Sequence, residues 1–259
     1  MNTRRTGVFT VDERNRIRDR ILEIANSDER IVAGAVVGSL ATDDGDRWSD
    51  LDLTFGVIPE NQALDVLDRL TTPLVREFSA VPLFDLPHRE SIFRVLLLQG
   101  CLQVDLSVTP ASSFGPIGPN FRILFGNYTE NPPIPAPPAG QLLGYAAHHA
   151  ARARFCIERG RFWQAEYWIS GARDYTLSLA CLQRNLSPHY GRGFDQLPAE
   201  VQMQAQRALV KSLDRAELLR ALACVVDGLL HEGRQITGNP AELEPHLLVL
   251  TVPWSEVSA

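Results

Sequence analysis

The stretch VVGSLATDDGDRWSDLDLTF, residues 36–55, decides the fold of this chain. It begins inside an apolar, β-branched run over residues 31–40, which predicts a buried strand ending at Gly38 and Ser39. A polar, acidic segment follows and predicts a loop. DLDLTFGV, beginning at residue 50, then predicts a second strand. A Gly-Ser pair therefore stands at the end of one strand, and an Asp-x-Asp pair stands at the start of the next.

The Asp-x-Asp pair predicts a site for a hard divalent cation. Alternate side chains of a strand share a face, so Asp50 and Asp52 point one way while Leu51 and Leu53 point the other. A rise of roughly 3.3 Å per residue places the two carboxylates about 7 Å apart along the strand. Carboxylates held that close repel each other unless a cation lies between them. Mg²⁺ takes oxygen ligands and commonly keeps substrate phosphates among them.

A third acid fits the same logic. In LQVDLSV, residues 102–108, apolar residues alternate with Gln103, Asp105 and Ser107, so Asp105 lies on the polar face of a half-buried strand. If that strand neighbours the Asp-x-Asp strand, three carboxylates converge and can hold one or two metals for phosphoryl transfer. Asp105 could instead accept the proton of an attacking hydroxyl. Arg94, a charge inside another predicted strand, is expected either to balance these acids or to reach solvent.

Gly38 and Ser39 predict a phosphate-binding turn beside the acids. Glycine lets the backbone turn sharply and lets a ligand approach closely. Freed backbone N–H groups at the end of a strand, together with the Ser39 hydroxyl, can bind phosphate oxygens. Phosphate donors next to a metal-binding acid pair suit a nucleoside triphosphate.

The rest of the chain predicts an α+β protein with two structural domains. Thr10 and Glu13 form a capping box that opens a helix over about residues 11–27, and a further helix is expected at 61–70. Strands are expected at 80–86, 91–99 and 102–108, with Gly100 and Cys101 in the turn between the last two. Eight of the 17 prolines lie between residues 110 and 138, which favours a linker or an extended segment.

Beyond the prolines the pattern is helical. Four segments carry apolar stripes near period 3.6, and Asp214 with Glu217 resembles a second capping box. We therefore expect a sheet-containing domain with flanking helices at residues 1–112, a proline-rich linker at 113–139 and an all-helical bundle domain at 140–259.

The amino-acid composition of the chain limits the classes of partner that we expect for it. The chain has 259 residues and a net charge of −6, most of it in residues 1–112, so a nucleic-acid partner is not expected. No apolar run is long enough to span a bilayer, and residues 1–14 lack the apolar core of a signal peptide. The four cysteines form no CxxC pair. We expect a cytoplasmic protein without a membrane partner. One lysine against 24 arginines indicates a GC-rich bacterial genome.

The combination of Gly38, Ser39, Asp50, Asp52 and Asp105 resembles the signature of the polymerase-β superfamily of nucleotidyltransferases. That signature is an apolar residue, Gly, Gly or Ser, a spacer of about ten residues, Asp-apolar-Asp-apolar, and a third acid on a following strand. The resemblance implies a minimal nucleotidyltransferase domain, a mixed sheet with flanking helices, for residues 1–112. It also implies Mg²⁺ as cofactor and ATP, or another nucleoside triphosphate, as co-substrate. Asp50, Asp52 and Asp105 would then be the metal ligands, and Gly38 and Ser39 would hold the triphosphate.

A minimal catalytic domain followed by a helical bundle resembles the antibiotic-resistance enzymes that adenylylate aminoglycosides or lincosamides. This implies transfer of a nucleoside monophosphate to a hydroxyl of a small molecule, with a carboxylate of the bundle as a second candidate base. Glu166 is that candidate, although Glu166 and Arg173 on one helical face fit a structural ion pair equally well. Arg192, in the predicted loop 187–198, is a candidate for the triphosphate tail. Asp43, Asp44 and Asp46 are either a solvated loop or an acidic rim that attracts a cationic acceptor.

Two other functions remain open at this point. The first is a non-catalytic partner protein similar to the antitoxin-type minimal nucleotidyltransferases, although all three acids are present. The second is nucleotide addition to RNA ends or to protein side chains, and the acidic composition disfavours RNA. The sequence specifies neither the acceptor nor the oligomeric state.

Overall fold

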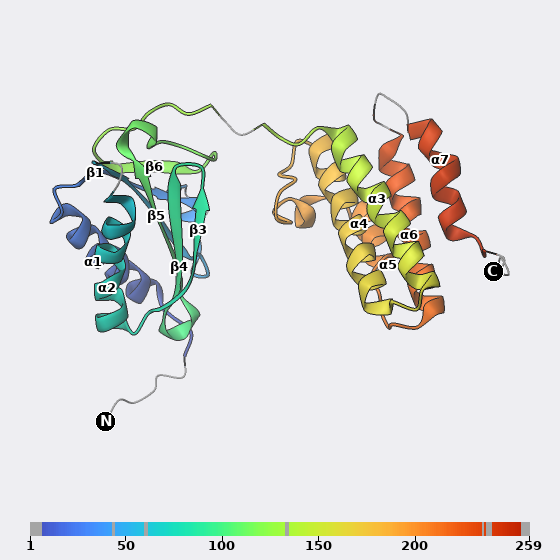
Figure 1. The fold of residues 1–259 in the computed structure, drawn as a ribbon, viewed down its shortest axis with the longest axis horizontal. Coiled ribbons are helices and arrows are strands. Elements are labelled where there is room, and N and C mark those ends of the chain that lie inside the picture. The colour runs from blue at the N-terminus through green and yellow to red at the C-terminus, as the bar shows by residue number, and fades with distance from the viewer. Residues whose placement is uncertain are drawn as a thin grey trace. The chain divides into compact units, whose positions relative to one another are not determined.

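The computed structural model describes residues 7–42, 45–59, 62–132, 135–234, 236 and 240–254. The chain divides into two compact units, Met1–Ile134 and Pro135–Ala259 (Figure 1). The first unit holds a six-stranded mixed sheet with flanking helices, and the second is helical, so the predicted α+β class is confirmed.

The sheet of the first unit has the strand order β3-β4-β5-β2-β1-β6. β2 pairs with β5 in parallel, and the other neighbours pair antiparallel. The strands are β1 Ile31–Val37, β2 Leu51–Val57, β3 Val81–His88, β4 Ser91–Leu97, β5 Gln103–Pro110 and β6 Phe121–Phe125. All five strands that the sequence predicts are present. Gly100 and Cys101 form the turn before β5, and both have positive φ.

Two helices lie against one face of this sheet (Figure 1). α1, Val11–Asn26, begins with the predicted capping box: the Glu13 amide donates to Thr10 Oγ1 at 3.2 Å, and the Thr10 amide donates to Glu13 Oε2 at 2.9 Å. α2 spans Ala63–Phe78, eight residues beyond the predicted end at 70, and passes through Pro73. Apolar side chains of both helices pack on the buried leucines of β2 and β5, because the apolar face of each strand points toward them.

The predicted linker begins too early. Residues 113–134 belong to the first unit, because β6 pairs with β1 at the edge of the sheet. The five residues of β6 contain no proline, so the dense prolines on either side of it do not interfere with pairing at an edge.

Among its described residues, the second unit contains the α-helices α3 Ala139–Glu158, α4 Phe162–Gln183, α5 Ala199–Arg207, α6 Arg215–Gly233 and α7 Pro240–Leu248. Alanine, leucine and valine side chains of α3, α4 and α6 form its main core. Short 3-10 helices occupy Gly38–Ala41, Gln99–Cys101, Ala111–Ser113, Phe194–Gln196 and Val249–Thr251. Within the described ranges, none of the helices combines the length and apolar content needed to cross a membrane.

Candidate metal centre and phosphate-binding turn

The three predicted acids come together at the start of β2. Asp52 and Asp105 are direct neighbours in the parallel pairing of β2 with β5, and Asp50 immediately precedes β2. One carboxylate oxygen of each residue lies within 4.8 Å of the others, and all three residues are half-buried. The parallel register brings the cluster about, because residues paired across neighbouring strands project to the same face.

The cluster lies on the face of the sheet opposite the two helices. Leu51, Leu53 and Leu106 are fully buried in the core that α1 and α2 cover. Side chains alternate along a strand, so Asp52 and Asp105 point away from that core. The acids are therefore accessible to a ligand without disturbing the apolar packing.

Electrostatics at the cluster favour a bound cation. Burial raises the pKa of the Asp105 carboxyl above its ordinary value, and the nearby charge of Asp50 raises this pKa further. The side-chain amide of Gln103 opposes these effects, because it donates to both Asp105 oxygens at 3.1 and 3.3 Å. Three carboxylates with oxygen atoms so close are a donor set suited to Mg²⁺. The residues present therefore fit the implied metal.

The Gly38-Ser39 turn touches the cluster directly. Gly38 directly follows β1 and has φ at +69°, a left-handed conformation that glycine adopts without strain. A Cβ atom at this position would lie 2.2 Å from Oδ2 of Asp52, so only glycine allows the backbone to pass this carboxylate. Ser39 follows in the 3-10 helix Gly38–Ala41 and is half-buried. The turn and the acids thus form one continuous site.

Two arginines that the sequence reasoning missed hold the loops around the site. Arg14 of α1 is only 5% exposed, and its Nη1 donates to the carbonyl oxygens of Asp46 at 2.8 Å and Ser49 at 2.7 Å. This fixes the loop that delivers Asp50 to the cluster. Arg122 of β6 donates to the Leu40 carbonyl at 3.0 Å, beside Ser39. A charged residue on the buried stripe of an amphipathic helix is the one sequence signal that could have singled out Arg14.

Arg94 does neither of the two things expected of it. Its guanidinium pairs with Asp68 of α2 and Asp85 of β3, each at 2.6 Å. Arg94 pairs in register with Leu106, whereas its neighbour Val95 pairs with Asp105. Arg94 consequently points to the helix-covered face, away from the acid cluster.

The other described residues that the sequence suggested for the site lie outside the acidic cluster. Glu166 lies in α4 of the second unit, where it accepts a hydrogen bond from Ser170 Oγ at 2.7 Å. Arg173 does not form the structural ion pair considered with Glu166, because it pairs with Asp174 at 2.9 Å. Arg192 is exposed in the second unit, with its guanidinium 5.6 Å from the centre of the Tyr190 ring. Asp43 and Asp44 lie outside the described residues, and Asp46 Oδ1 accepts from the amide of Trp48 at 2.8 Å.

Comparison with known proteins gives only distant structural similarity to report. A scan against protein-family models finds no match, and a search of curated proteins finds none either. Among solved structures, an aminoglycoside 6-adenyltransferase from Bacillus subtilis aligns over 90% of this chain and 97% of its own, with a TM-score of 0.37 and 10% sequence identity. A similarity at that level identifies neither a reaction nor a substrate.

Proposed function

We propose that this protein is a Mg²⁺-dependent nucleotidyltransferase that moves a nucleoside monophosphate, AMP from ATP, to a hydroxyl of a small molecule. The observation that carries the proposal is the cluster of Asp50, Asp52 and Asp105 oxygens within 4.8 Å of one another. The Gly38-Ser39 turn against Asp52 supports it, because a triphosphate needs backbone donors next to its metal. The resemblance of this motif to the polymerase-β superfamily agrees with the geometry.

The roles of the residues follow from their chemistry. Bound Mg²⁺ would neutralise the triphosphate and polarise the α-phosphorus. Asp50 and Asp52 would hold the metal, and the turn at Ser39 would bind the phosphate oxygens. The acceptor oxygen forms a bond to the α-phosphorus, the bond to the β-phosphate oxygen breaks, and pyrophosphate leaves. The proton of the acceptor hydroxyl passes to a carboxylate, for which Asp105 and Glu166 are the two candidates.

The acceptor we propose is an aminoglycoside-like polycation, which would make the protein an antibiotic-resistance enzyme of the bacterial cytoplasm. Most of the negative charge of the chain belongs to residues 1–112, which favours a cationic acceptor over RNA. Arg192, exposed in the second unit, is the candidate for the triphosphate tail.

Transfer of label from ATP labelled at the α-phosphate tests the proposal. The full chain is incubated with Mg²⁺ and a panel of aminoglycosides, lincosamides and bacterial lysate, and labelled products are separated. Changes in the second shell of a metal site already cost about 10–100-fold, so Asp52→Asn is expected to reduce transfer by at least about 100-fold. Asp65→Asn is the matched control, because it removes the same charge from an exposed position on α2. Equal activity of Asp52→Asn and Asp65→Asn would remove the metal-ligand role.

Binding measurements separate loss of catalysis from absence of a site. Mg²⁺-ATP should raise the melting temperature of the wild-type chain and leave that of Asp52→Asn unchanged. A chain that gains no thermal protection from Mg²⁺-ATP and labels no acceptor would be the non-catalytic, antitoxin-like alternative. The variant Glu166→Gln distinguishes the two candidate bases. If it keeps thermal protection by Mg²⁺-ATP but loses transfer, Glu166 is the base. If it transfers normally, Asp105 is the base.

A further inference from the structure

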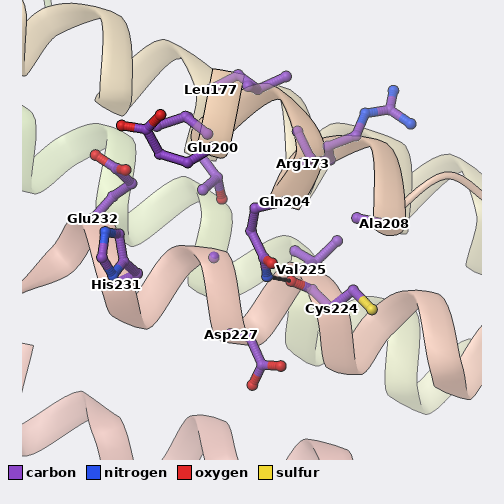
Figure 2. A pocket seen from close by; sticks show the side chains of 14 residues that line it. Arg173, Leu177, Glu200, Gln204, Ala208, Cys224, Val225, Asp227, His231 and Glu232 are labelled. Carbon is purple, nitrogen blue, oxygen red and sulfur yellow. Dashed lines mark hydrogen bonds between the residues drawn. The ribbon is translucent and has the colours of Figure 1, made fainter. Parts of the chain in front are cut away.

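The second unit contains a cavity of about 360 Å³ that neither Glu166 nor Arg192 lines (Figure 2). It lies between α4, α5 and α6, within one compact unit, and its volume is within the usual range for small-molecule sites. Apolar side chains form much of its wall: Leu177 from α4, Val201, Ala205 and Ala208 from and just after α5, and Val225 from α6. The side chain of Gln204 donates to the Cys224 carbonyl at 3.1 Å, so this amide is already engaged (Figure 2).

The charged groups around the cavity leave an excess of negative charge. Glu232 is 3% exposed and pairs with Arg184 at 2.8 Å, and Arg173 pairs with Asp174 at 2.9 Å. Each of these two ion pairs has no net charge, so neither adds to the net charge around the cavity. Glu200 and Asp227 also line the cavity, are exposed, and have no ion-pair partner among the described residues. Glu200, His231 and Glu232 gather at one end, with Arg173 and Cys224 at the other (Figure 2).

We propose that this cavity binds a small organic ammonium ion with an apolar body. The apolar wall would bury the hydrocarbon part of the ligand, and burial of apolar surface is the main source of affinity in such sites. The ammonium would pair with Glu200 or Asp227, the two exposed carboxylates that line the cavity. A polyol would leave its hydroxyls unpaired against the apolar wall, and an anion would be repelled by the two carboxylates.

Three probes that share a phenylethyl group test the chemistry on the full chain. 2-Phenylethylammonium, 2-phenylethanol and 3-phenylpropanoate are titrated separately, with binding followed by calorimetry and by the methyl NMR signals of Val201 and Val225. The ammonium probe should bind at least threefold more tightly than the alcohol and shift both methyl signals, and the carboxylate should bind most weakly. Equal binding of ammonium and alcohol would overturn the assignment of a cationic ligand. Failure of the ammonium probe to shift either methyl signal would overturn the site itself.

Single substitutions separate the contribution of the carboxylate to probe binding from that of the apolar wall. Glu200→Gln should weaken the ammonium probe about threefold and leave the alcohol unchanged, since an exposed ion pair contributes modestly. Asp195→Asn, which removes an exposed charge of the same unit outside the cavity, is the matched control and should change neither. Ala205→Phe should fill the cavity and reduce binding of both probes by more than tenfold, with circular dichroism checking that the variant is folded. Undiminished binding by a folded Ala205→Phe would place the probes elsewhere.

The cavity is separate from the proposed transferase site. The cavity belongs to α4, α5 and α6, whereas the acidic cluster belongs to the sheet of the first unit. Asp52→Asn is therefore expected to bind the ammonium probe as the wild-type chain does. Unchanged probe binding together with lost transfer would support both assignments, and lost probe binding in Asp52→Asn would contradict an independent site.

Discussion

Asp105 sets the electrostatic character of the candidate metal centre. Its pKa in the folded chain is raised by burial and by Asp50, so the folded protein binds this proton more tightly than the unfolded chain does. The favourable contribution of the protonated group is complete below the unfolded pKa, about 3.9, and is lost as the pH rises through the folded pKa. At neutral pH the ionised carboxylate therefore destabilises the metal-free fold.

Asp105→Asn should consequently stabilise the metal-free protein at pH 7.5. We expect a gain of about 0.5–2 kcal/mol in the free energy of unfolding, the usual range for relief of an unfavourable charge, and a smaller gain at pH 4.5. Urea denaturation with a chelator present measures both values. Added Mg²⁺ should stabilise the wild-type chain only. A variant less stable than wild type at pH 7.5 would show that the Gln103 hydrogen bonds outweigh the repulsion.

Gly38 matters to both the fold and the site, because a Cβ atom at this position would disturb the turn as well as Asp52. Alanine at this position combines positive φ with a Cβ 2.2 Å from the Asp52 carboxylate. Gly38→Ala should cost about 2 kcal/mol of stability and abolish protection by Mg²⁺-ATP, because either the turn or Asp52 must move. Gly118→Ala, where nothing lies within 4 Å of the added Cβ, is the control and should change neither property. Thermal melts with and without Mg²⁺-ATP make the comparison, and normal nucleotide protection of Gly38→Ala would detach the turn from the site.

At the scale of elements, local signals identified most of the first unit. The capping box of α1 and the alternation in β5 involve residues close in sequence, and both were predicted correctly. The meeting of Asp105 with Asp52 was predicted only conditionally, because the pairing of β2 with β5 is a long-range contact. β6 was missed since proline density outweighed a five-residue strand, and the end of α2 was missed because Pro73 lies inside it.

In the second unit, too, local sequence signals do not predict the contacts that form. Asp214 does precede α6, but Glu217 does not complete the predicted capping box. Its Oε1 instead accepts from the Lys211 amide at 2.9 Å. The roles of Arg14 and Arg154 in holding distant segments could not be predicted from the sequence pattern, because the backbone carbonyls to which they donate lie 32 to 98 residues away.

Arg154 attaches the C-terminal segment to α3. Its side chain is 1% exposed, and Nη1 donates to the carbonyls of Leu250 at 2.7 Å and Val252 at 2.9 Å. The guanidinium also lies 4.3 Å from the centre of the Trp254 ring. One buried cation thus satisfies carbonyl groups that the segment after α7 cannot pair by itself.

Arg154→Met should cost about 2–3 kcal/mol, because the buried carbonyls lose their donor while the methionine keeps the apolar volume. Amide hydrogen exchange of residues 240–252 should accelerate in the variant, and exchange in the first unit should not change. Arg152→Met, two residues earlier on α3, loses a cation–π contact with Trp168 and no other hydrogen bond, ion pair or ring contact among the described residues, so it should cost less than about 1 kcal/mol. Unaltered exchange near residue 250 in Arg154→Met would refute this role.

At the scale of the whole molecule, the three candidate metal ligands, Asp50, Asp52 and Asp105, lie together in the first of the two units. The core beneath α1 and α2 and the core of α3, α4 and α6 are separate clusters among the described residues. Each unit buries its own apolar surface, which is the condition for folding alone. The first unit also holds the turn and all three acids.

A fragment of residues 1–134 should therefore fold and gain thermal protection from Mg²⁺-ATP, with a weaker affinity than the full chain because the fragment lacks Arg192. A fragment of residues 1–112, ending where sequence composition alone places the boundary, should be unstable or aggregate. It lacks β6, so β1 would expose an unpaired edge and the buried side chains of Ala33 and Ala35. Size-exclusion chromatography and Mg²⁺-ATP melts of the two fragments decide between the boundaries. Equal behaviour of the two would mean that β6 contributes nothing to the unit. A folded 1–134 fragment without nucleotide protection would instead mean that the second unit completes the triphosphate site, which is the role proposed for Arg192.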